Sequence, residues 1–484
     1  MSRLIVGPFN RVEGDLEVKL EIADGAVAEV RVVSPLYRGF EQILQGKDPR
    51  DAMVYAPRIC GICSVSQSMA SARAIAAAQG LAKVPPNGDL ARNLILAAEN
   101  VADHLTHFYL FFMPDFARDA YQGEPWHADM AVRFRALKGT ALQDVLPARA
   151  EFMHIVGLMA GKWPHTLTLQ PGGTTKSVEV QEKSRLAALL GGFRRFLEGS
   201  LFGAPLERVI ALESLDDLAT LLTEIGPEGS DMARFLNAAD ALALDRAGRA
   251  ADRFMSYGAY ESADGHLFAR GLFADGEAGD VDPKLIAEDV THAWMQGSKG
   301  PLHPFEGHTV PEWSEDGGYT WCKAPRLDGQ VVEVGALARQ VVDGHPLIRD
   351  AVSASGGNVR NRVLARLLEI ALVTVAMESW VGRLMPGEPF CAHADMPEGA
   401  DGFGLVEAAR GSLGHWLTVR DGRIWNYQIV APTTWNFSPR DAADVPGALE
   451  QALVGAPIRT GETEPVAVQH IVRSFDPCMV CTVH

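Results

Sequence analysis

The sequence predicts a mostly helical α+β fold, a central bundle of helices with small antiparallel sheets at its periphery. Three observations lead to this expectation. The segment 363–377 is apolar almost all round, which is typical of a helix buried among other helices. Residues 16–33 instead alternate apolar and polar side chains, as a half-buried strand does. Two Cys-x-x-Cys pairs, at 60–63 and 478–481, lie near opposite ends of the chain, so a site built from both pairs requires the ends to meet.

The strands are predicted in two hairpins. In the first, Leu16, Val18, Leu20 and Ile22 face one way, Asp24-Gly25 forms the turn, and 26–33 returns. In the second, 415–420 and 423–430 flank Asp421-Gly422.

Helical periodicity predicts the segments between the hairpins. The predicted helix 89–113 is long enough to cross a domain core, and Pro114 ends it. The predicted helices are 66–79, 89–113, 148–160, 178–198, 283–297, 334–343 and 359–385. Segments 225–230, 274–282 and 313–319 are expected to be surface loops.

Length and composition limit the classes of function. The 484 residues would suggest about three domains on length alone, but a site shared by both ends predicts one domain, 1–484. A net charge of −17 argues against a nucleic acid partner, because the phosphates would be repelled. No apolar run reaches the roughly 18 residues of a membrane span, and 1–11 lacks the apolar core of a signal peptide. Six cysteines without a disulfide framework indicate a reducing compartment, so we expect the cytoplasm.

The cysteine pairs form the candidate metal site. A Cys-x-x-Cys spacing lets a turn direct two sulfurs at one point, and Cys60, Cys63, Cys478 and Cys481 together would make a soft, highly charged site. A structural zinc ion joining the chain ends is one interpretation, although zinc ribbons separate their pairs by only about 15 to 20 residues. A thioredoxin-like motif is a weaker one, because neither pair follows an obvious strand and opens a helix in a βαβ pattern.

The sequence blocks around the cysteines resemble a known family. The blocks are Asn10-Arg-Val-Glu-Gly14, Tyr37-Arg-Gly-Phe-Glu-Gln42, Glu407-Ala-Ala-Arg-Gly-Ser-Leu-Gly-His-Trp416, Pro432-Thr-Thr-Trp-Asn436 and Asp476-Pro-Cys-Met-Val-Cys-Thr-Val-His484. In this order, over the whole chain, they resemble the large, active-site subunit of the nickel-iron hydrogenases. The resemblance implies that family's fold and its chemistry, the reversible splitting of dihydrogen into two protons and two electrons.

The resemblance also implies a metal centre. Cys60 and Cys478 would bind nickel terminally, while Cys63 and Cys481 would bridge nickel to an iron that carries carbon monoxide and cyanide. A metal-bound thiolate such as Cys478 can itself accept a proton, because the metal keeps it deprotonated. Glu13 matches a glutamate hydrogen-bonded to the terminal cysteine of the C-terminal pair. Burial and like charge raise the pKa of such a carboxyl, so Glu13 is the candidate for carrying the proton away.

A second set of residues is carried over in the same way. Glu41, His484 and the backbone carbonyl of Ile429 match positions that hold Mg²⁺, whose preferred ligands are oxygens. Arg410 matches an arginine placed over the metals, where its planar donors can hydrogen-bond a cyanide.

Further residues would surround the cyanides and Arg410. Thr433 and the backbone near Ala431 would solvate the other cyanide, and Asp115 and Asp476 would hold the Arg410 guanidinium. His104, His107 and His165 are expected to be structural, because single histidines on apolar faces usually are.

Departures from the common enzyme pattern favour the regulatory, hydrogen-sensing branch of the family. Gln67 replaces a histidine usual in uptake enzymes, and an amide cannot take up a proton. Ala409 stands where proline is usual, and Ile62 and Phe111 are bulkier than their common counterparts, which would narrow a gas path. The chain ends at His484, as the sensing relatives are made, whereas catalytic subunits are generally made with a removable extension.

Alternatives and partners complete the expectation. The alternatives are a catalytic uptake hydrogenase, a zinc-stapled structural subunit, and a quinone-binding respiratory-complex relative, which would lack the four cysteines. Cys322 and Cys391 are too few to hold an iron-sulfur cluster, which takes four ligands. An iron-sulfur small subunit is therefore the expected partner, in a heterodimer or a dimer of heterodimers, and the sensing role adds a histidine kinase.

Overall fold

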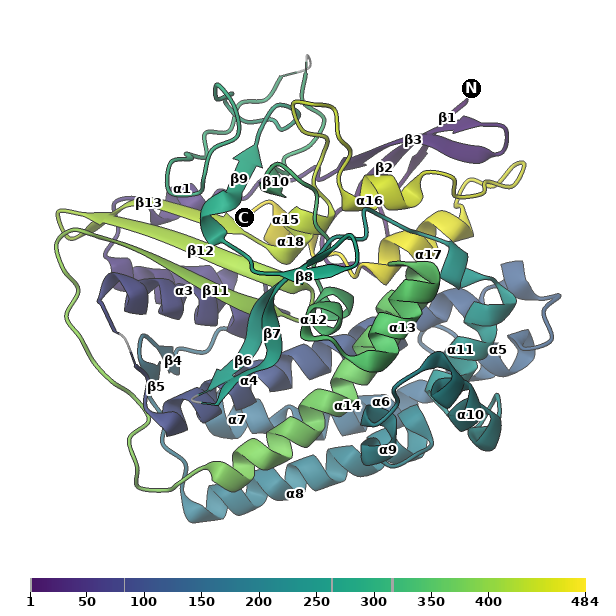
Figure 1. Ribbon diagram of the computed structural model, residues 1–484, viewed down its shortest axis with the longest axis horizontal. Coiled ribbons are helices and arrows are strands. Elements are labelled where there is room, and N and C mark those ends of the chain that lie inside the picture. Colours follow the sequence, from purple (N-terminus) through teal and green to yellow (C-terminus); the bar gives the residue numbers. More distant parts are fainter. Residues whose placement is uncertain (1, 82, 263, 315–316) are drawn as a thin grey trace.

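The computed structural model describes residues 2–81, 83–262, 264–314 and 317–484. Two long helices, α14 (Val359–Arg383) and α4 (Pro86–Thr106), pack together in the core, and α8 (Val180–Phe196) packs against α14 along the lower edge in Figure 1. α14 is buried over most of its length, which confirms the predicted all-round apolar helix. The longer remaining helices are α3 (Ser64–Ala78), α5 (His127–Phe134), α6 (Ala141–Phe152), α7 (His154–Ala160), α10 (Leu215–Ile225), α11 (Asp231–Ala241), α12 (Ala336–Asp343), α13 (Pro346–Ser355) and α17 (Val466–Ser474).

Short helices fill the connections. They are α1 (Phe40–Leu44), α2 (Ala52–Tyr55), α9 (Leu206–Ile210), α15 (Pro432–Asn436), α16 (Ala448–Leu453) and α18 (Met479–Thr482). α4 does not run to 113 as one α-helix, because it continues as a π-helical turn, His107–Phe112, and then a 3₁₀ turn, Met113–Ala117. The wider turn is common at functional positions of helices.

The sheets are small, antiparallel and peripheral, as predicted. β1 (Ser2–Val6), β2 (Glu17–Ala23) and β3 (Ala26–Val33) form the N-terminal sheet, and β11 (Ala400–Ala408), β12 (Gly411–Arg420) and β13 (Arg423–Val430) form the C-terminal one. Both predicted hairpins are therefore confirmed, each with a further strand. The remaining strands are β4 (Leu169–Gln170), β5 (Gly173–Thr174), β6 (Phe254–Ser262), β7 (Gly265–Ala274), β8 (Glu277–Gly279), β9 (Ile286–Asp289) and β10 (Ala324–Leu327).

One predicted helix is wrong. Segment 283–297 contains a single 3₁₀ turn, Pro283–Leu285, followed by strand β9, which pairs with β10. The strand forms because β10 offers backbone partners and because the Glu288 carboxylate binds the buried Lys323 ammonium at 3.1 Å. Segment 274–282, expected as a loop, contains β8, and part of 313–319 lies outside the described residues.

The two ends of the chain are interleaved. The N–H of Glu13 donates to the carbonyl of Pro477 at 3.3 Å, and the N–H of Met479 donates to the carbonyl of Glu13 at 2.7 Å. In Figure 1 the C-terminus lies within the outline of the molecule, and His484 is buried rather than part of a tail. Segments more than four hundred residues apart therefore share one core, as the cysteine pattern required.

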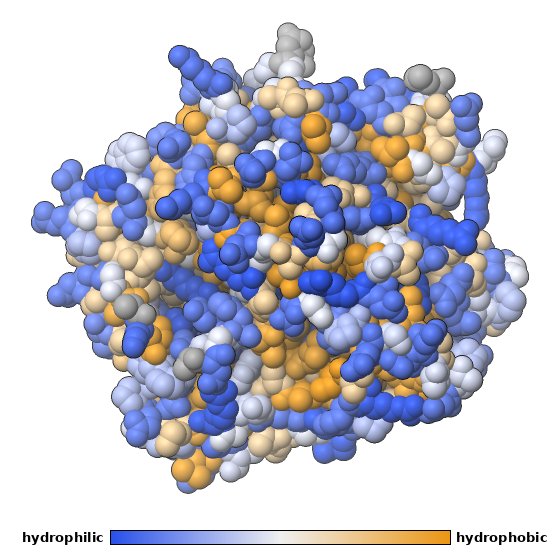
Figure 2. Space-filling model, viewed as in Figure 1, coloured by the Kyte–Doolittle hydropathy of each residue, from blue (hydrophilic) through white to orange (hydrophobic). Residues whose placement is uncertain are grey.

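The outer surface is mixed in character. Figure 2 shows polar and charged residues over most of one face, with apolar residues visible between them. Among the described residues, none of the helices combines the length and the apolar character that a membrane crossing requires.

Candidate metal centre

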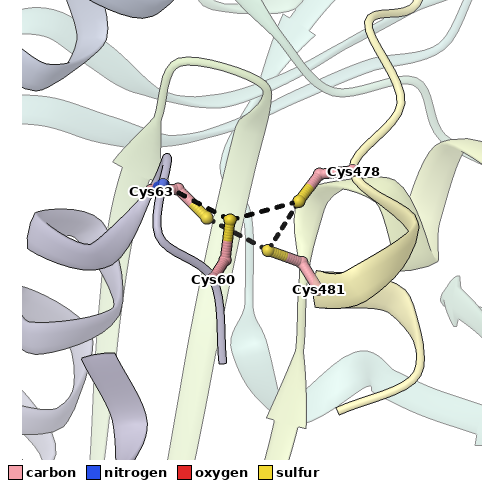
Figure 3. A group of neighbouring side chains, drawn as sticks. All are labelled: Cys60, Cys63, Cys478 and Cys481. Atoms are coloured by element: carbon pink, nitrogen blue, oxygen red, sulfur yellow. Dashed lines mark hydrogen bonds between the residues drawn. The ribbon is translucent and has the colours of Figure 1, made fainter. Parts of the chain in front are cut away.

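Four buried sulfurs converge from the two ends of the chain (Figure 3). Cys60 and Cys63 come from the turn that precedes α3, and Cys478 and Cys481 come from the start of α18. The Sγ atoms of Cys478 and Cys481 lie 2.9 Å apart, those of Cys63 and Cys481 lie 3.0 Å apart, and those of Cys60 and Cys478 lie 3.5 Å apart. All four ligand atoms lie within 4.8 Å of one another. The four cysteines are therefore placed to bind metal.

The pKa shifts of the four thiols indicate that the site favours a bound cation. Hydrogen bonds from Cys478, Cys481 and Cys63 hold the pKa of Cys60 well below its ordinary value. Hydrogen bonding and burial raise the pKa of Cys63, and burial raises the pKa values of Cys478 and Cys481. Without a cation one thiolate is favoured and the other three resist ionisation, so soft metal cations match this donor set.

A buried carboxylate fixes the turn that carries the first cysteine pair. Glu99 on α4 accepts hydrogen bonds from the N–H groups of Val65 and Ser66, at 2.7 and 2.9 Å, and from the Trp163 indole at 3.0 Å. It thus caps the N-terminus of α3, immediately after Cys63. Burial raises the pKa of Glu99 to about 7, against these donors. Sequence analysis missed Glu99, although a carboxylate inside an apolar helix is a visible signal.

Glu13 lies half-buried beside the sulfurs. Burial, followed by the charge of Cys60, raises the pKa of the Glu13 carboxyl. Its backbone pairs with Cys478, and within the described part of the chain its carboxyl makes no hydrogen bond to the Cys478 thiol. The side-chain contact implied by the resemblance therefore stays a prediction.

Arg410 is buried against two carboxyls. Its guanidinium contacts Asp103 at 2.5 and 3.2 Å and Asp476 at 3.1 Å. Burial raises the pKa of Asp103 to about 8, while Arg410 lowers the pKa of Asp476 against the effect of burial. The two carboxyls thus share one guanidinium and titrate as a pair.

The prediction that Asp115 holds Arg410 is wrong. Asp115 instead pairs with Arg473 at 2.6 Å and with Arg11, and Asp103 takes the place beside Arg410. The reason is geometric, because Asp103 lies on α4 whereas Asp115 lies beyond the π-helical turn, in the 3₁₀ turn that faces Arg473 on α17.

Asp115 belongs to a second buried network, which holds the segment before Glu13. The Arg473 guanidinium also donates to the Asn10 carbonyl at 3.0 Å and to the Asn10 side chain at 2.8 Å. Although burial opposes it, Arg473 and then Arg11 lower the pKa of Asp115. The network fixes the position from which Glu13 faces the sulfurs.

Glu41 and His484 lie together beside the C-terminal cysteine pair, where Nδ1 of His484 is 2.6 Å from the Cys481 carbonyl. The His484 Nε2 is 3.2 Å from Glu41 Oε1, and the N–H of Ile429 donates to the same oxygen at 2.8 Å. The resemblance had singled out the Ile429 carbonyl. Lys323, which sequence analysis missed, places its ammonium 3.4 Å from Glu41. Burial would raise the pKa of Glu41, but Lys323 and His484 lower it to about 2.

The remaining candidate residues lie around the cysteines or apart from them. Thr433 on α15 accepts a hydrogen bond from the N–H of Cys478 at 3.0 Å, and Ala431 precedes this helix. Ile62 is half-buried between the first two cysteines, and Phe111 is half-buried with its carbonyl bound by Arg11 at 2.9 Å. His104, His107 and His165 contact Glu369, the Arg473 carbonyl and the Pro57 carbonyl, at 3.1, 2.7 and 2.9 Å.

Comparison with known proteins gives one consistent result. The family described as nickel-dependent hydrogenase matches residues 38–131 and 230–484. The chain is 30% identical to the periplasmic [NiFeSe] hydrogenase large subunit of Desulfomicrobium baculatum, covering 100% of this chain and 95% of that protein. It is 29% identical to the hydrogenase-2 large chain of Escherichia coli (strain K12), covering 100% and 97%. It is 28% identical to the uptake hydrogenase large subunit of Rhodobacter capsulatus, covering 100% and 95%.

Solved structures agree in fold. The H2-activated [NiFeSe]-hydrogenase of Dm. baculatum superposes with a TM-score of 0.86 at 29% identity, and each chain is covered in full. The Ni-Fe-Se hydrogenase of D. vulgaris Hildenborough, in the as-isolated oxidized state, gives 0.84 at 30% identity, again with each chain covered in full. The fold is that of the large subunit of these proteins, as predicted.

Proposed function

Because this chain belongs to the nickel-dependent hydrogenase family, as its large, active-site subunit, we propose that it acts as a hydrogen sensor that binds dihydrogen and splits it slowly into two protons and two electrons. The observation that carries the proposal is the convergence of four thiol sulfurs within 4.8 Å, from opposite ends of the chain. We also propose that 1–484 is one domain, since the four-sulfur site cannot form without both ends of the chain.

The cysteines would hold a nickel-iron centre with carbon monoxide and cyanide on the iron. When bound, such a centre supplies the electrophilic, redox-active site at which dihydrogen is split. Cys60 and Cys478 are the proposed terminal ligands of nickel, and Cys63 and Cys481 the proposed bridging ligands. The donor set fits, because soft thiolates suit these metals and the unfavourable ionisation of three of the four thiols is relieved by cations.

Arg410, Thr433 and the backbone near Ala431 are the proposed surroundings of the cyanides. A guanidinium held by Asp103 and Asp476 keeps a fixed orientation, so the one N–H group that these contacts leave, on Nη1, can bind an anion without reorganisation. The Thr433 hydroxyl accepts from the N–H of Cys478, which leaves its own proton free to be donated.

Glu13 is the proposed proton acceptor. Its raised pKa, caused by burial and the nearby Cys60 charge, lets the carboxyl cycle between both forms closer to neutral pH. Its half-buried position offers a step between the sulfurs, where Cys478 would first hold a proton, and the outside.

A Mg²⁺ ion is proposed at Glu41 and His484. Oxygens of Glu41, Glu288 and the Gln428 side chain are hard ligands of the kind that Mg²⁺ prefers, and the Ile429 carbonyl is the proposed backbone ligand, although it is the Ile429 N–H that contacts Glu41. Lys323 already supplies one positive charge there, so the ion would have to share these acids with the ammonium.

Sensing rather than energy-conserving uptake is proposed because of Gln67. The side-chain N–H of Gln67 lies 3.9 Å from the Cys481 sulfur, within N–H···S hydrogen-bond distance. A neutral amide at this position cannot take up a proton. Catalytic uptake is the second candidate. It is favoured by the names of the relatives, which are large subunits of a periplasmic [NiFeSe] hydrogenase, of hydrogenase-2 and of an uptake hydrogenase.

An iron-sulfur small subunit is the proposed partner. Electrons leaving the buried site need nearby acceptors, and the two other cysteines lie apart: Cys322 is buried against the Thr434 carbonyl, and Cys391 is half-buried near the Pro171 carbonyl. We further propose a histidine kinase as the recipient of the signal and the cytoplasm as the compartment.

The test uses the protein purified with its own partner chains. Metal analysis should give nickel and iron near one each, infrared spectra should show carbon monoxide and cyanide bands, and dihydrogen-dependent dye reduction should stay below about 1 s⁻¹, at the low end for enzymes. Zinc as the sole metal would overturn the hydrogenase proposal. Fast turnover with the expected metals would instead support uptake over sensing.

A further inference from the structure

Three buried polar side chains form a line that ends at the Cys481 sulfur. The Tyr427 hydroxyl on β13 lies 2.7 Å from Nδ1 of His415 on β12. The other nitrogen of that ring, Nε2, lies 2.8 Å from the Oε1 of Gln67 on α3. The Gln67 Nε2 lies 3.9 Å from the Cys481 Sγ. Each of these three side chains is fully buried, so no solvent competes with the contacts.

The secondary structure holds this line in place. β12 and β13 pair so that His415 lies opposite Ile429, whose N–H binds Glu41. The rings of His415 and Tyr427 meet edge to face with centroids 5.5 Å apart, which fixes the plane of the imidazole. Gln67 lies in the first turn of α3. Its backbone N–H donates to the carbonyl of Cys63 at 3.1 Å, which holds the residue in place.

The chemistry of the groups sets the direction of each hydrogen bond. A tyrosine hydroxyl is protonated at neutral pH, so the Tyr427 hydroxyl can donate. Burial lowers the pKa of His415 to about 3, so the ring is neutral, with one donor nitrogen and one acceptor. If Tyr427 donates to Nδ1, Nε2 carries the hydrogen, donates to the Gln67 carbonyl oxygen and leaves the amide N–H facing the sulfur. The reverse order would place that carbonyl oxygen against a thiolate, which repels it.

We propose that Tyr427 and His415 are positioning residues that hold the Gln67 amide as a permanent hydrogen-bond donor to the Cys481 sulfur. This deepens the proposed function and rests on it, because Cys481 is taken there as a bridging ligand. A donor to a ligand sulfur withdraws electron density from the metals and so tunes them. Bonds that all point the same way also polarise one another, which strengthens the last and longest contact.

The test removes only the first donor. In Tyr427→Phe the ring packing is kept while the hydroxyl is lost, so His415 is free to change its tautomer and Gln67 to rotate. The carbon monoxide infrared band should move to lower wavenumber, because a less neutralised thiolate gives the iron more charge to donate into the ligand. ¹⁵N spectra of histidine-labelled protein should show the His415 ring leave a single neutral form with hydrogen on Nε2.

Two further variants make the test specific. Tyr121→Phe removes a similar buried contact, from Tyr121 to His470 Nε2 at 2.6 Å, and should leave the band unmoved. Gln67→Leu should lower the band directly, and Tyr427→Phe should then add no further shift, because both changes act through one amide. Metal content and circular dichroism establish that each variant is folded.

Two results would overturn the proposal. One is an unchanged band and an unchanged His415 signal in Tyr427→Phe. The other is an equal shift from Tyr427→Phe with and without Gln67, which would mean that the hydroxyl acts by another route. A parent protein without any carbon monoxide band would remove the proposed function instead, and the His415 signal would then still decide whether Tyr427 sets the ring.

Discussion

Removing the charge of Asp115 should destabilise the protein, because the guanidiniums of Arg11, Arg118 and Arg473 would lose the carboxylate that they share. Asp115 is fully buried, and the Arg473 side chain is only 2% exposed. Breaking a buried ion pair at one side costs about 3 to 5 kcal/mol, since the remaining charge stays buried. With Asp115→Asn, one oxygen still accepts, so the lower end, about 3 kcal/mol, is expected. At a urea slope of about 3 kcal/mol/M the unfolding midpoint would fall by about 1 M.

The assay is urea unfolding followed by circular dichroism, with a surface pair as control. Glu21→Gln weakens the Arg3–Glu21 contact of 2.6 Å, whose side chains are 72% and 35% exposed, and should leave the midpoint unchanged. Asp115→Asn should also slow deuterium exchange with dihydrogen, because Arg473 would hold Asn10, and hence the segment of Glu13, less firmly. If the variant unfolded at the same urea concentration as the parent, the reasoning that the Asp115 carboxylate stabilises the buried guanidiniums would be refuted.

The pH dependence of the same variant has a definite sign. The pKa of Asp115 is lowered in the folded protein, so its ionised form contributes stability at pH values above the unfolded pKa of about 3.9. That contribution is lost as the pH falls through the lower folded-state pKa. The gap between the parent and Asp115→Asn should therefore be constant near neutrality and shrink in acid. A gap that grew in acid would contradict the assignment.

Three other changes have definite expected results. Glu13→Gln keeps shape but removes the exchangeable proton, so deuterium exchange should fall by about 10² to 10⁴ with the metals retained; near-parent exchange would indicate another proton route. Glu99→Gln replaces an acceptor oxygen by a donor facing Val65 and Trp163 or Ser66, so the protein should lose nickel faster to a chelator, whereas unchanged nickel retention would mean that this cap does not set the cysteine turn. Ile62→Val with Phe111→Leu should keep hydrogen activity within a few-fold but lose it in air while the parent retains it; equal tolerance of air would mean that the two side chains simply fill space.

The elements that were predicted correctly are those whose structure depends on the pattern of their own residues. The all-round apolar run of α14 and the alternation of β2 and β3 are properties of the segments themselves, and both elements formed as expected. Segment 283–297 failed because its apolar residues fit either period, and the partner that decided it, β10, lies about forty residues further on. Helices α10 and α11 were missed although Ser214 and Ser230 cap them, a start signal visible in the sequence.

The same distinction between local pattern and tertiary packing holds for the residues of the site. A Cys-x-x-Cys spacing constrains two sulfurs by itself, so the cysteine cluster could be predicted from the sequence. Asp115 was assigned to Arg410 by the resemblance alone, whereas the carboxyl that reaches Arg410 depends on how α4 gives way to a π-helical turn, which the sequence did not indicate. Lys323, just before β10, and His415, on β12, reach their partners through tertiary packing, which no spacing in the sequence encodes.

The interleaving of Glu13 with Cys478 also has a consequence in time. Closing a loop of this length costs about 5 kcal/mol in chain entropy, so the contact is favourable only after much of the intervening core has formed. Synthesis runs from the N-terminus at about 5 to 20 residues per second, and Cys60 and Cys478 are 418 residues apart, so the first thiols exist for about 20 to 80 s before the last are made. Throughout that interval Cys60 and Cys63 are a two-sulfur site awaiting its other half, open to oxidation or to a foreign metal while the ribosome is still working.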